Sequence, residues 1–159
     1  MEKIQKTNAM RALDTAKINY RVQSYPVDES DLSGVHAAES LGVSPDVVFK
    51  TIVARAGIQE YRVFCIPVGD ELDLKKCAVV SGDKRLELLH VKELLPTTGY
   101  IRGGCSPIGM KKKFPTYIDE TAILFDEIYL SAGVRGTQII INPQDLVTFL
   151  DSSFHDLVK

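Results

Sequence analysis

The sequence predicts an α+β fold of the broad α/β class, in which helices surround a mixed, mostly antiparallel, barrel-like sheet of six or more strands. Two observations lead to this prediction. Runs typical of strands form hairpin-like pairs in some places and are separated by helical patterns in others. Neither GxGxxG nor the P-loop pattern GxxxxGKS/T occurs, so the glycine motifs of nucleotide-binding folds give no support to a doubly wound parallel sheet.

Capping and turn residues mark the predicted elements in the first half of the chain. Thr7 or Asn8 can cap the first helix, and Gly42 lies just beyond the second, where helices often end on glycine. Asp70 or Asp73 can cap a later helix. The expected elements are a helix over residues 8–19, a strand over 20–25, a helix over 35–41, a helix start at 44–46, strands over 48–54 and 61–68, and a helix over 74–82.

Two prolines mark helix boundaries in the second half. Pro96 is expected to stop a short helix, because proline cannot donate a backbone hydrogen bond inside one, and Pro143 is expected to begin an amphipathic helix. The expected elements are a strand over residues 84–88, a helix over 90–95, strands over 116–119, 127–131 and 137–142, and a helix from 143.

The composition is typical of one globular domain covering residues 1–159, with 45% hydrophobic and 25% charged residues. The sequence contains neither an apolar run of about 18 residues nor an apolar segment behind its first residues, so we expect no membrane span and no secretory signal. Cys65, Cys77 and Cys105 form no CxxC pair, which fits reduced thiols in the cytoplasm. The net charge of −2 means that any contact with nucleic acid must use a local basic patch.

A glycine-rich segment at residues 103–109, Gly-Gly-Cys-Ser-Pro-Ile-Gly, is followed closely by Lys111, Lys112 and Lys113. Consecutive N–H groups in such a turn can converge on an oxyanion, and the lysines can bind a polyanion. A tight structural turn with a solvated charge run behind it explains the same residues equally well. A second glycine-bearing loop at residues 131–136 is either a plain hairpin turn or a wall that faces the first loop across the mouth of a pocket.

Lys50 lies in a predicted strand that carries apolar residues on both faces. Burial of its ammonium group is costly unless the group lines a polar pocket or meets a partner. The alternative is a lysine at the strand end, with its stem buried and its ammonium group in water.

Other candidate catalytic groups are few. His36, His90 and His155 occur in no metal-binding or triad motif, so we expect neither a metal nor another cofactor. Cys105 can be a nucleophile only as a thiolate, which needs a neighbouring base or a positive field. We favour the alternative that Cys105 is a small hydrophobic residue.

Five segments carry a resemblance to a known family through their order and spacing. They are Phe49-Lys50-Thr51, Leu74-Lys75-Lys76, the run from Thr98 to Gly109, the run from Ser131 to Gly136, and Pro143-Gln144-Asp145-Leu146. On these segments the chain closely resembles the YbaK family of Cys-tRNA(Pro) deacylases. That family belongs to the same superfamily as the editing domain inserted in bacterial prolyl-tRNA synthetase.

The resemblance implies a mixed β-barrel with surrounding helices, and hydrolysis of tRNA(Pro) that carries the wrong amino acid. It implies Lys50 as the catalytic residue and the loop from Gly103 to Pro107 as the segment that holds the aminoacyl carbonyl and the terminal ribose. The chain departs from the family pattern at Ser33, where many members have an aromatic residue, and at Met110, where a polar residue is frequent. The expected substrate-binding residues are Tyr25, Thr51, Gly103, Gly104, Ser106, Pro107, Ser131 and Gly133, and the expected tRNA-binding residues are Lys111, Lys112 and Lys113.

The expected function is therefore trans-editing of mischarged Cys-tRNA(Pro), with the substrate's own thiol as nucleophile and an enzyme that positions the ester and stabilises the oxyanion. A deacylase for alanine or serine and a non-catalytic tRNA- or synthetase-binding module are the alternatives. Aminoacylated tRNA(Pro) is the expected partner, prolyl-tRNA synthetase is a candidate second partner, and both a monomer and a weak dimer remain open.

Overall fold

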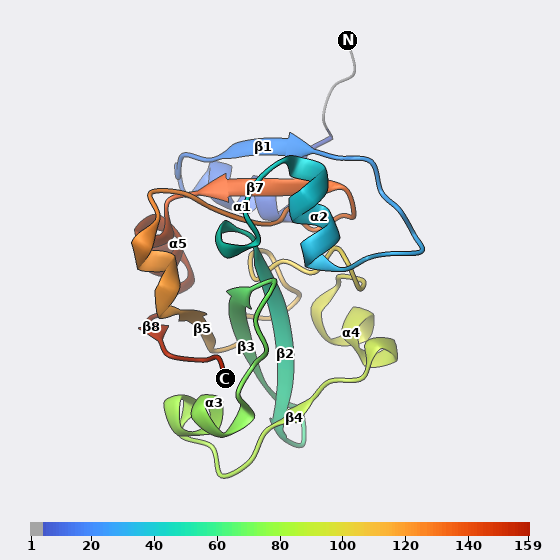
Figure 1. Cartoon of the computed structure of the whole chain (residues 1–159). Coiled ribbons are helices and arrows are strands. Elements are labelled where there is room, and N and C mark those ends of the chain that lie inside the picture. Colours follow the sequence, from blue (N-terminus) through green and yellow to red (C-terminus); the bar gives the residue numbers. More distant parts are fainter. Residues whose placement is uncertain (1–4) are drawn as a thin grey trace.

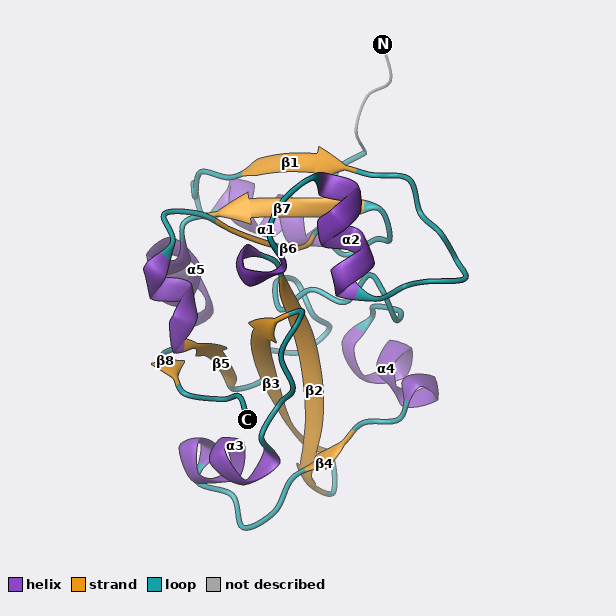
Figure 2. Cartoon of the chain, in the orientation of Figure 1, coloured by secondary structure: helices purple, strands orange, loops and turns teal. Residues whose placement is uncertain are grey.

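The computed structural model describes residues 5–159, which form two sheets that run nearly crosswise with helices around them (Figures 1 and 2). With η denoting a 3₁₀ helix, the elements are α1 (Asn8–Thr15), β1 (Arg21–Ser24), α2 (Gly34–Leu41), η1 (Pro45–Val47), β2 (Phe49–Gly57), β3 (Glu60–Pro67), α3 (Leu74–Ser81), β4 (Glu87–Leu88), α4 (Val91–Thr98), β5 (Thr116–Asp119), η2 (Glu120–Leu124), β6 (Ile128–Ser131), β7 (Thr137–Ile141), α5 (Pro143–Leu150) and β8 (Phe154–His155).

The strand pairing is mixed, as the sequence predicts. One sheet has the order β1–β7–β6 and is antiparallel, and the other has the order β4–β2–β3–β5–β8. In the second sheet β2 pairs antiparallel with β3 and β4, whereas β5 pairs parallel with β3 and β8. The sheets meet where Val48, just before β2, forms a single parallel bridge with Tyr129 of β6.

The expectation of one barrel-like sheet needs correction, although the α+β class is confirmed. Within residues 5–159 the strands divide between two sheets that do not close into a barrel. The physical reason is that one isolated bridge, between Val48 and Tyr129, cannot continue a hydrogen-bonded ladder from one sheet to the other.

The predicted helix caps explain why the helices begin and end where they do. The Thr7 hydroxyl accepts a hydrogen bond from the Met10 amide, and the Asp73 carboxylate accepts bonds from the first amides of α3. Gly42 and Gly82 adopt the left-handed conformation directly after α2 and α3. Both strands of the β2–β3 hairpin and the helix that starts at Pro143 also occur as predicted.

Four local expectations differ from the structure. The first helix ends at Thr15, since Lys17 turns the chain with a φ of 59°. The segment from Pro45 is only a 3₁₀ turn, and the short pairing of β8 has no counterpart in the prediction. Pro96 lies inside α4 rather than beyond its end. The last turn survives there because the Thr98 hydroxyl donates to the Leu94 carbonyl at 2.8 Å and the Gly99 amide donates to Leu95.

The main apolar core lies where α1 and α5 pack against the three-stranded sheet and the start of β2. It contains Met10, Leu13, Phe49, Ile139 and Leu146, each at most 3% exposed. A second cluster around Phe64, Ile66 and Cys77 packs α3 against the other sheet. The first core fixes β7 and the first residues of β2, which carry the candidate site. No helix in the described part of the chain is long and apolar enough to cross a membrane.

Candidate functional site

A cavity of about 290 Å³ lies at the start of β2, between α2 and the two glycine-bearing loops. We call it the Lys50 cavity. Five of the predicted site residues line it: Tyr25, Lys50, Thr51, Gly103 and Ser131. Its other lining residues are Leu32, Ser33, Gly34, Ala37, Val48, Phe49, Val68, Arg102, Cys105 and Gln138.

The remaining predicted site residues do not line this cavity. Gly104 packs behind its wall, and the buried Ser106 hydroxyl accepts a hydrogen bond from the Ile108 amide at 3.2 Å. Pro107 borders a different cavity beside α5, and Gly133 borders a third cavity beside α1.

The predicted tRNA-binding lysines also lie outside the Lys50 cavity. Lys112 and Lys113 border the cavity beside α5, together with Met110 and Phe114. Lys111 and Lys112 border another cavity that contains Tyr61. The three lysines therefore border surfaces that share no lining residue with the Lys50 cavity.

Lys50 reaches the cavity from the second residue of β2, where its backbone pairs with Ile66 of β3. Its ammonium group is partly buried, and Nζ donates to the carbonyl oxygen of Val68 at 3.4 Å. Burial lowers the pKa of Lys50, and the carboxylates of Asp70 and Glu71 oppose that shift. Among residues 5–159 no carboxylate lies within salt-bridge distance of Nζ, so this cation is available to a negative charge in the cavity.

The glycine loop is held in shape by its own hydrogen bonds and by the facing loop. The Gly104 amide donates to the Ile101 carbonyl at 2.9 Å, so this N–H is not free to bind a substrate oxygen. The Arg135 Nε donates to the Arg102 carbonyl at 2.9 Å. In the described residues no hydrogen bond uses the amides of Gly103 and Cys105, and both residues line the cavity. These two N–H groups are the candidates for an oxyanion site.

Cys105 lies in the cavity wall but is only 8% exposed. Burial raises the pKa of its thiol to about 12, so the side chain is protonated at neutral pH. A protonated, buried thiol is a poor nucleophile, and this fits the interpretation of Cys105 as a small hydrophobic residue.

Gln138 is a residue that the sequence analysis missed. Gln138 lines the Lys50 cavity and is 6% exposed, and its buried Oε1 receives no hydrogen bond from any donor in residues 5–159. A buried amide oxygen without a donor is costly, so a ligand in the cavity that donates a hydrogen bond would relieve it. The signal in the sequence is a glutamine before the apolar run Ile139–Ile141, on the middle strand of a sheet.

The histidines lie elsewhere. None of His36, His90 and His155 borders the Lys50 cavity, and His155 exchanges a hydrogen bond with the Ser153 hydroxyl at 2.7 Å. Within the described residues no group of three or more histidine, cysteine or carboxylate side chains is arranged to hold a metal ion. The Lys50 cavity offers a bound substrate the Lys50 cation and the backbone amides of its lining residues.

Comparison with known proteins places this geometry in a family. The family model of the aminoacyl-tRNA editing domain matches residues 32–149, which include both glycine-bearing loops and every lining residue of the Lys50 cavity except Tyr25. The chain belongs to the aminoacyl-tRNA editing domain family. This confirms the family expected from the sequence motifs.

Individual relatives agree with this assignment. The chain is 46% identical over 153 residues to an Enterococcus faecalis protein named "Putative Cys-tRNA(Pro)/Cys-tRNA(Cys) deacylase EbsC", and the match covers 96% of this chain and 93% of that protein. A crystal structure described as "a putative trans-editing enzyme for prolyl tRNA synthetase" shares the fold with a TM-score of 0.84, at 24% identity and with 96% and 95% of the two chains covered. A hypothetical protein of known structure matches with a TM-score of 0.86, at 19% identity and with 96% and 100% covered.

Proposed function

We propose that this protein is a trans-editing hydrolase that removes cysteine from mischarged Cys-tRNA(Pro). The observation that carries the proposal is that one cavity of an editing-domain protein is lined by Lys50, whose cation has no carboxylate partner among residues 5–159, by Gly103 and Cys105, whose amides are unpaired there, and by Gln138, whose buried amide oxygen has no donor there. These groups match the parts of an aminoacyl ester: a carbonyl that becomes an oxyanion, an α-ammonium group that donates hydrogen bonds, and a ribose next to a phosphate.

In this mechanism Lys50 acts as a cation rather than as a general base. Its ammonium group, partly removed from water, stabilises negative charge that develops at the ester more strongly than a solvated lysine would. The amides of Gly103 and Cys105 donate to the carbonyl oxygen as it becomes negative. Gln138 accepts a hydrogen bond from the α-ammonium group of the bound amino acid, which orients the ester.

The substrate supplies the nucleophile. The cysteinyl sulfur, as a thiolate, attacks its own carbonyl carbon, the ester C–O bond breaks, and the terminal ribose oxygen leaves and takes up a proton. The products are free tRNA and a cyclic thiolactone, which water opens to cysteine. Part of a cysteine thiol is ionised near neutral pH and a serine hydroxyl is not, so the mechanism favours cysteine over serine. Cys105 has no role as nucleophile here.

Two alternatives follow from specific features. Ser33 lies in the wall of the Lys50 cavity where many relatives have an aromatic residue, so a different amino-acid preference, for alanine or serine, is the nearest alternative. A non-catalytic tRNA- or synthetase-binding module is the second, and the free cation of Lys50 argues against it.

The wider setting is part of the proposal. A single editing domain over residues 1–159 would act in the cytoplasm on aminoacylated tRNA(Pro). Prolyl-tRNA synthetase is a candidate partner that would select this tRNA for it. Lys111, Lys112 and Lys113 would contact the tRNA backbone away from the Lys50 cavity, in a salt-dependent manner.

A panel of mischarged tRNAs tests the proposal. Purified protein, without added metal, is incubated with tRNA(Pro) charged with cysteine, alanine, serine or proline, and the remaining aminoacyl-tRNA is measured over time. We expect Cys-tRNA(Pro) to be cleared fastest and Pro-tRNA(Pro) to persist. Faster loss of the alanyl or seryl ester would show that the protein is a deacylase for that amino acid instead. The absence of any turnover would favour the non-catalytic binding module. S-methylation of the substrate cysteine should abolish turnover.

A further inference from the structure

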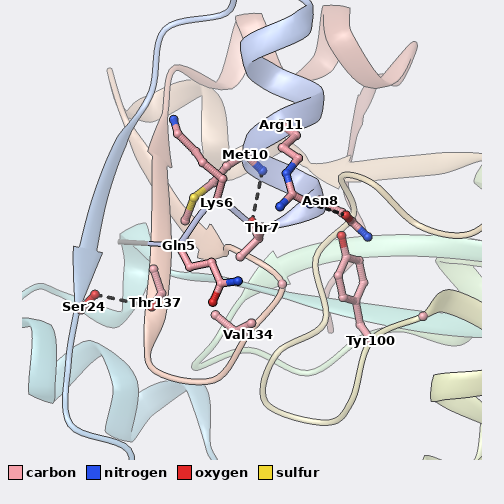
Figure 3. A pocket seen from close by; sticks show the side chains of 12 residues that line it. Gln5, Lys6, Thr7, Asn8, Met10, Arg11, Ser24, Tyr100, Val134 and Thr137 are labelled. Carbon is pink, nitrogen blue, oxygen red and sulfur yellow. Dashed lines mark hydrogen bonds between the residues drawn. The ribbon is translucent and has the colours of Figure 1, made fainter. Parts of the chain in front are cut away.

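A second cavity, about 590 Å³ in volume, lies beside α1 and is not used by the proposed function (Figure 3). We call it the α1 cavity. The residues that matter here are Lys6, Arg11, Ser24, Tyr100, Val134 and Thr137, all of which line it. They come from the segment before α1, from α1 itself, from the paired ends of β1 and β7, and from both glycine-bearing segments.

The α1 cavity and the Lys50 cavity lie on opposite sides of β7. Thr137 lines the first and the next residue, Gln138, lines the second. At the end of the neighbouring strand, Ser24 lines the α1 cavity and Tyr25 lines the Lys50 cavity. Ser24 of β1 pairs with Thr137 of β7. Successive residues of a strand point to opposite faces, so one pair of strands separates the two cavities. The loop at residues 131–136 contributes to both, through Ser131 on one side and Val134 on the other.

The lining of the α1 cavity combines positive charge with flat apolar surface. Lys6 and Arg11 are cations, and among residues 5–159 no carboxylate lines the cavity. Lys6 is paired with Asp14 at 2.9 Å, whereas the Arg11 guanidinium contacts only the Asn8 side chain among the described residues, at 3.2 Å. Arg11 is exposed, so its remaining donors can reach an anion in the cavity.

Val134 provides most of the apolar part, because Tyr100 also lines the cavity but is only 7% exposed. The Tyr100 hydroxyl donates to the Ile108 carbonyl at 2.6 Å, which fixes the ring. The ring lies against Gly133 so closely that a methyl group there would stand 2.8 Å from it. Val134, at 44% exposed, holds its side chain toward the cavity near Gln5 (Figure 3). A cation beside aromatic and apolar surface suits a nucleotide, whose phosphate is an anion and whose base is flat.

We propose that the α1 cavity binds the unpaired RNA nucleotides that precede the acylated terminal nucleotide. Arg11 contacts a backbone phosphate, and a base lies against Tyr100 and Val134. This inference rests on the proposed function, because it takes the acylated RNA end as the occupant of the Lys50 cavity. The RNA then crosses the loop at residues 131–136, which contributes to both cavities.

Binding of uncharged RNA tests the inference without any need for catalysis. The probes are two fluorescent RNA minihelices with the same stem, one with four unpaired 3′ nucleotides and one with a single unpaired 3′ nucleotide. Arg11→Ala removes the phosphate contact and Val134→Trp fills the cavity. Arg85→Ala is the matched control, because Arg85 is an exposed arginine that borders neither cavity. Thermal unfolding verifies that each variant is folded.

We expect Arg11→Ala to weaken binding of the long overhang about fivefold and to lower the slope of log affinity against log salt by about 0.7. Val134→Trp should weaken the same probe at least as much. Both variants should bind the short overhang as the wild type does, and Arg85→Ala should change neither affinity. Wild-type affinity of both cavity variants for the long overhang would overturn the inference, as would displacement of the long overhang by adenosine monophosphate alone at the same concentration.

The two proposals fail in different ways. If the wild type deacylates none of the charged tRNAs but the variants show the expected loss of RNA binding, the proposed function fails and the RNA-binding role of the α1 cavity stands. If the wild type deacylates Cys-tRNA(Pro) and the variants bind both minihelices normally, the inference fails and the proposed function stands.

Discussion

Gly104 faces the backbone of Val134 so closely that a methyl group on its α-carbon would stand 3.0 Å from the Val134 carbonyl carbon. The hydrogen bond from Arg135 to the Arg102 carbonyl joins the same two segments. The glycine loop and the 131–136 loop therefore form one unit, and a backbone shift in either loop moves a wall of the Lys50 cavity.

Gly103→Ala tests whether this unit is functional or only a structural turn. Gly103 has a φ of 83° and Gly82, at the end of α3, has a φ of 76°, so alanine strains both positions by about 1–2 kcal/mol. We expect Gly103→Ala and the control Gly82→Ala to lower Tm similarly. Only Gly103→Ala should also lower kcat/KM for Cys-tRNA(Pro) deacylation, because its methyl group lies at the cavity. Equal activity in the two variants would mean that the loop is only a turn.

Lys50→Ala removes the cation of the cavity. We expect deacylation to fall about 30- to 1000-fold, which corresponds to about 2–4 kcal/mol of lost transition-state stabilisation. Lys75→Ala, on the exposed face of α3, is the control and should keep wild-type kcat/KM. Circular dichroism of both variants establishes that they are folded. A folded Lys50→Ala protein with near wild-type turnover would remove Lys50 from the mechanism.

Gln138→Leu should lower turnover of Cys-tRNA(Pro) without lowering the free energy of unfolding. Leucine removes the buried oxygen that has no donor, so the free energy of unfolding should stay the same or rise, by up to about 1–3 kcal/mol. Turnover of Cys-tRNA(Pro) should nevertheless fall, since the acceptor for the α-ammonium group is lost. Urea unfolding and single-turnover kinetics measure the two effects. A clear loss of stability would instead assign the amide a structural role.

Alkaline pH should destabilise the fold through its buried thiols. Burial raises the pKa of Cys65, Cys77 and Cys105 from 9.0 to about 12, so between pH 9 and 12 the unfolded chain has released protons that the folded chain retains. The unfolded state then binds fewer protons, and the free energy of unfolding falls as pH rises, by about 1.4 kcal/mol per pH unit for each thiol. Stability from this source is complete below pH 9.

Urea titrations from pH 7.5 to 10.5 measure this effect, and Cys105→Ala provides the comparison. In Cys105→Ala the free energy of unfolding should fall less steeply with pH, by the contribution of one thiol. The variant should keep its deacylation activity at neutral pH. An unchanged slope in Cys105→Ala would show that this thiol titrates normally. Loss of activity in the folded variant would revive Cys105 as a nucleophile.

Local patterns were enough to predict most of the fold. The caps at Thr7 and Asp73 and the glycines after α2 and α3 act through backbone geometry within a few residues, so the sequence alone locates those helix ends. Pro96 was placed wrongly because its cost is compensated by hydrogen bonds from Thr98 and Gly99, which depend on the folded turn. The division into two sheets depends on pairing between residues 81 positions apart, Val48 and Tyr129, which no local pattern records.

The candidate site was predictable to a similar degree. The structure brings Lys50 and Gly103, which the sequence motifs singled out, to one cavity. The alternating pattern along this strand does not predict which residues border the cavity. Successive side chains point to opposite faces, yet the cavity is bordered by Val48, Phe49, Lys50 and Thr51. The involvement of Gln138 depends on an unpaired oxygen that only the folded packing reveals.

The five-stranded sheet ends on both sides in strands of only two residues, β4 and β8. A second chain that adds to β4 or β8 can form very few backbone hydrogen bonds, because each of these strands has only two residues. Accidental strand addition is therefore disfavoured at these edges, and this protects the chain against amyloid-like growth at high cellular concentration.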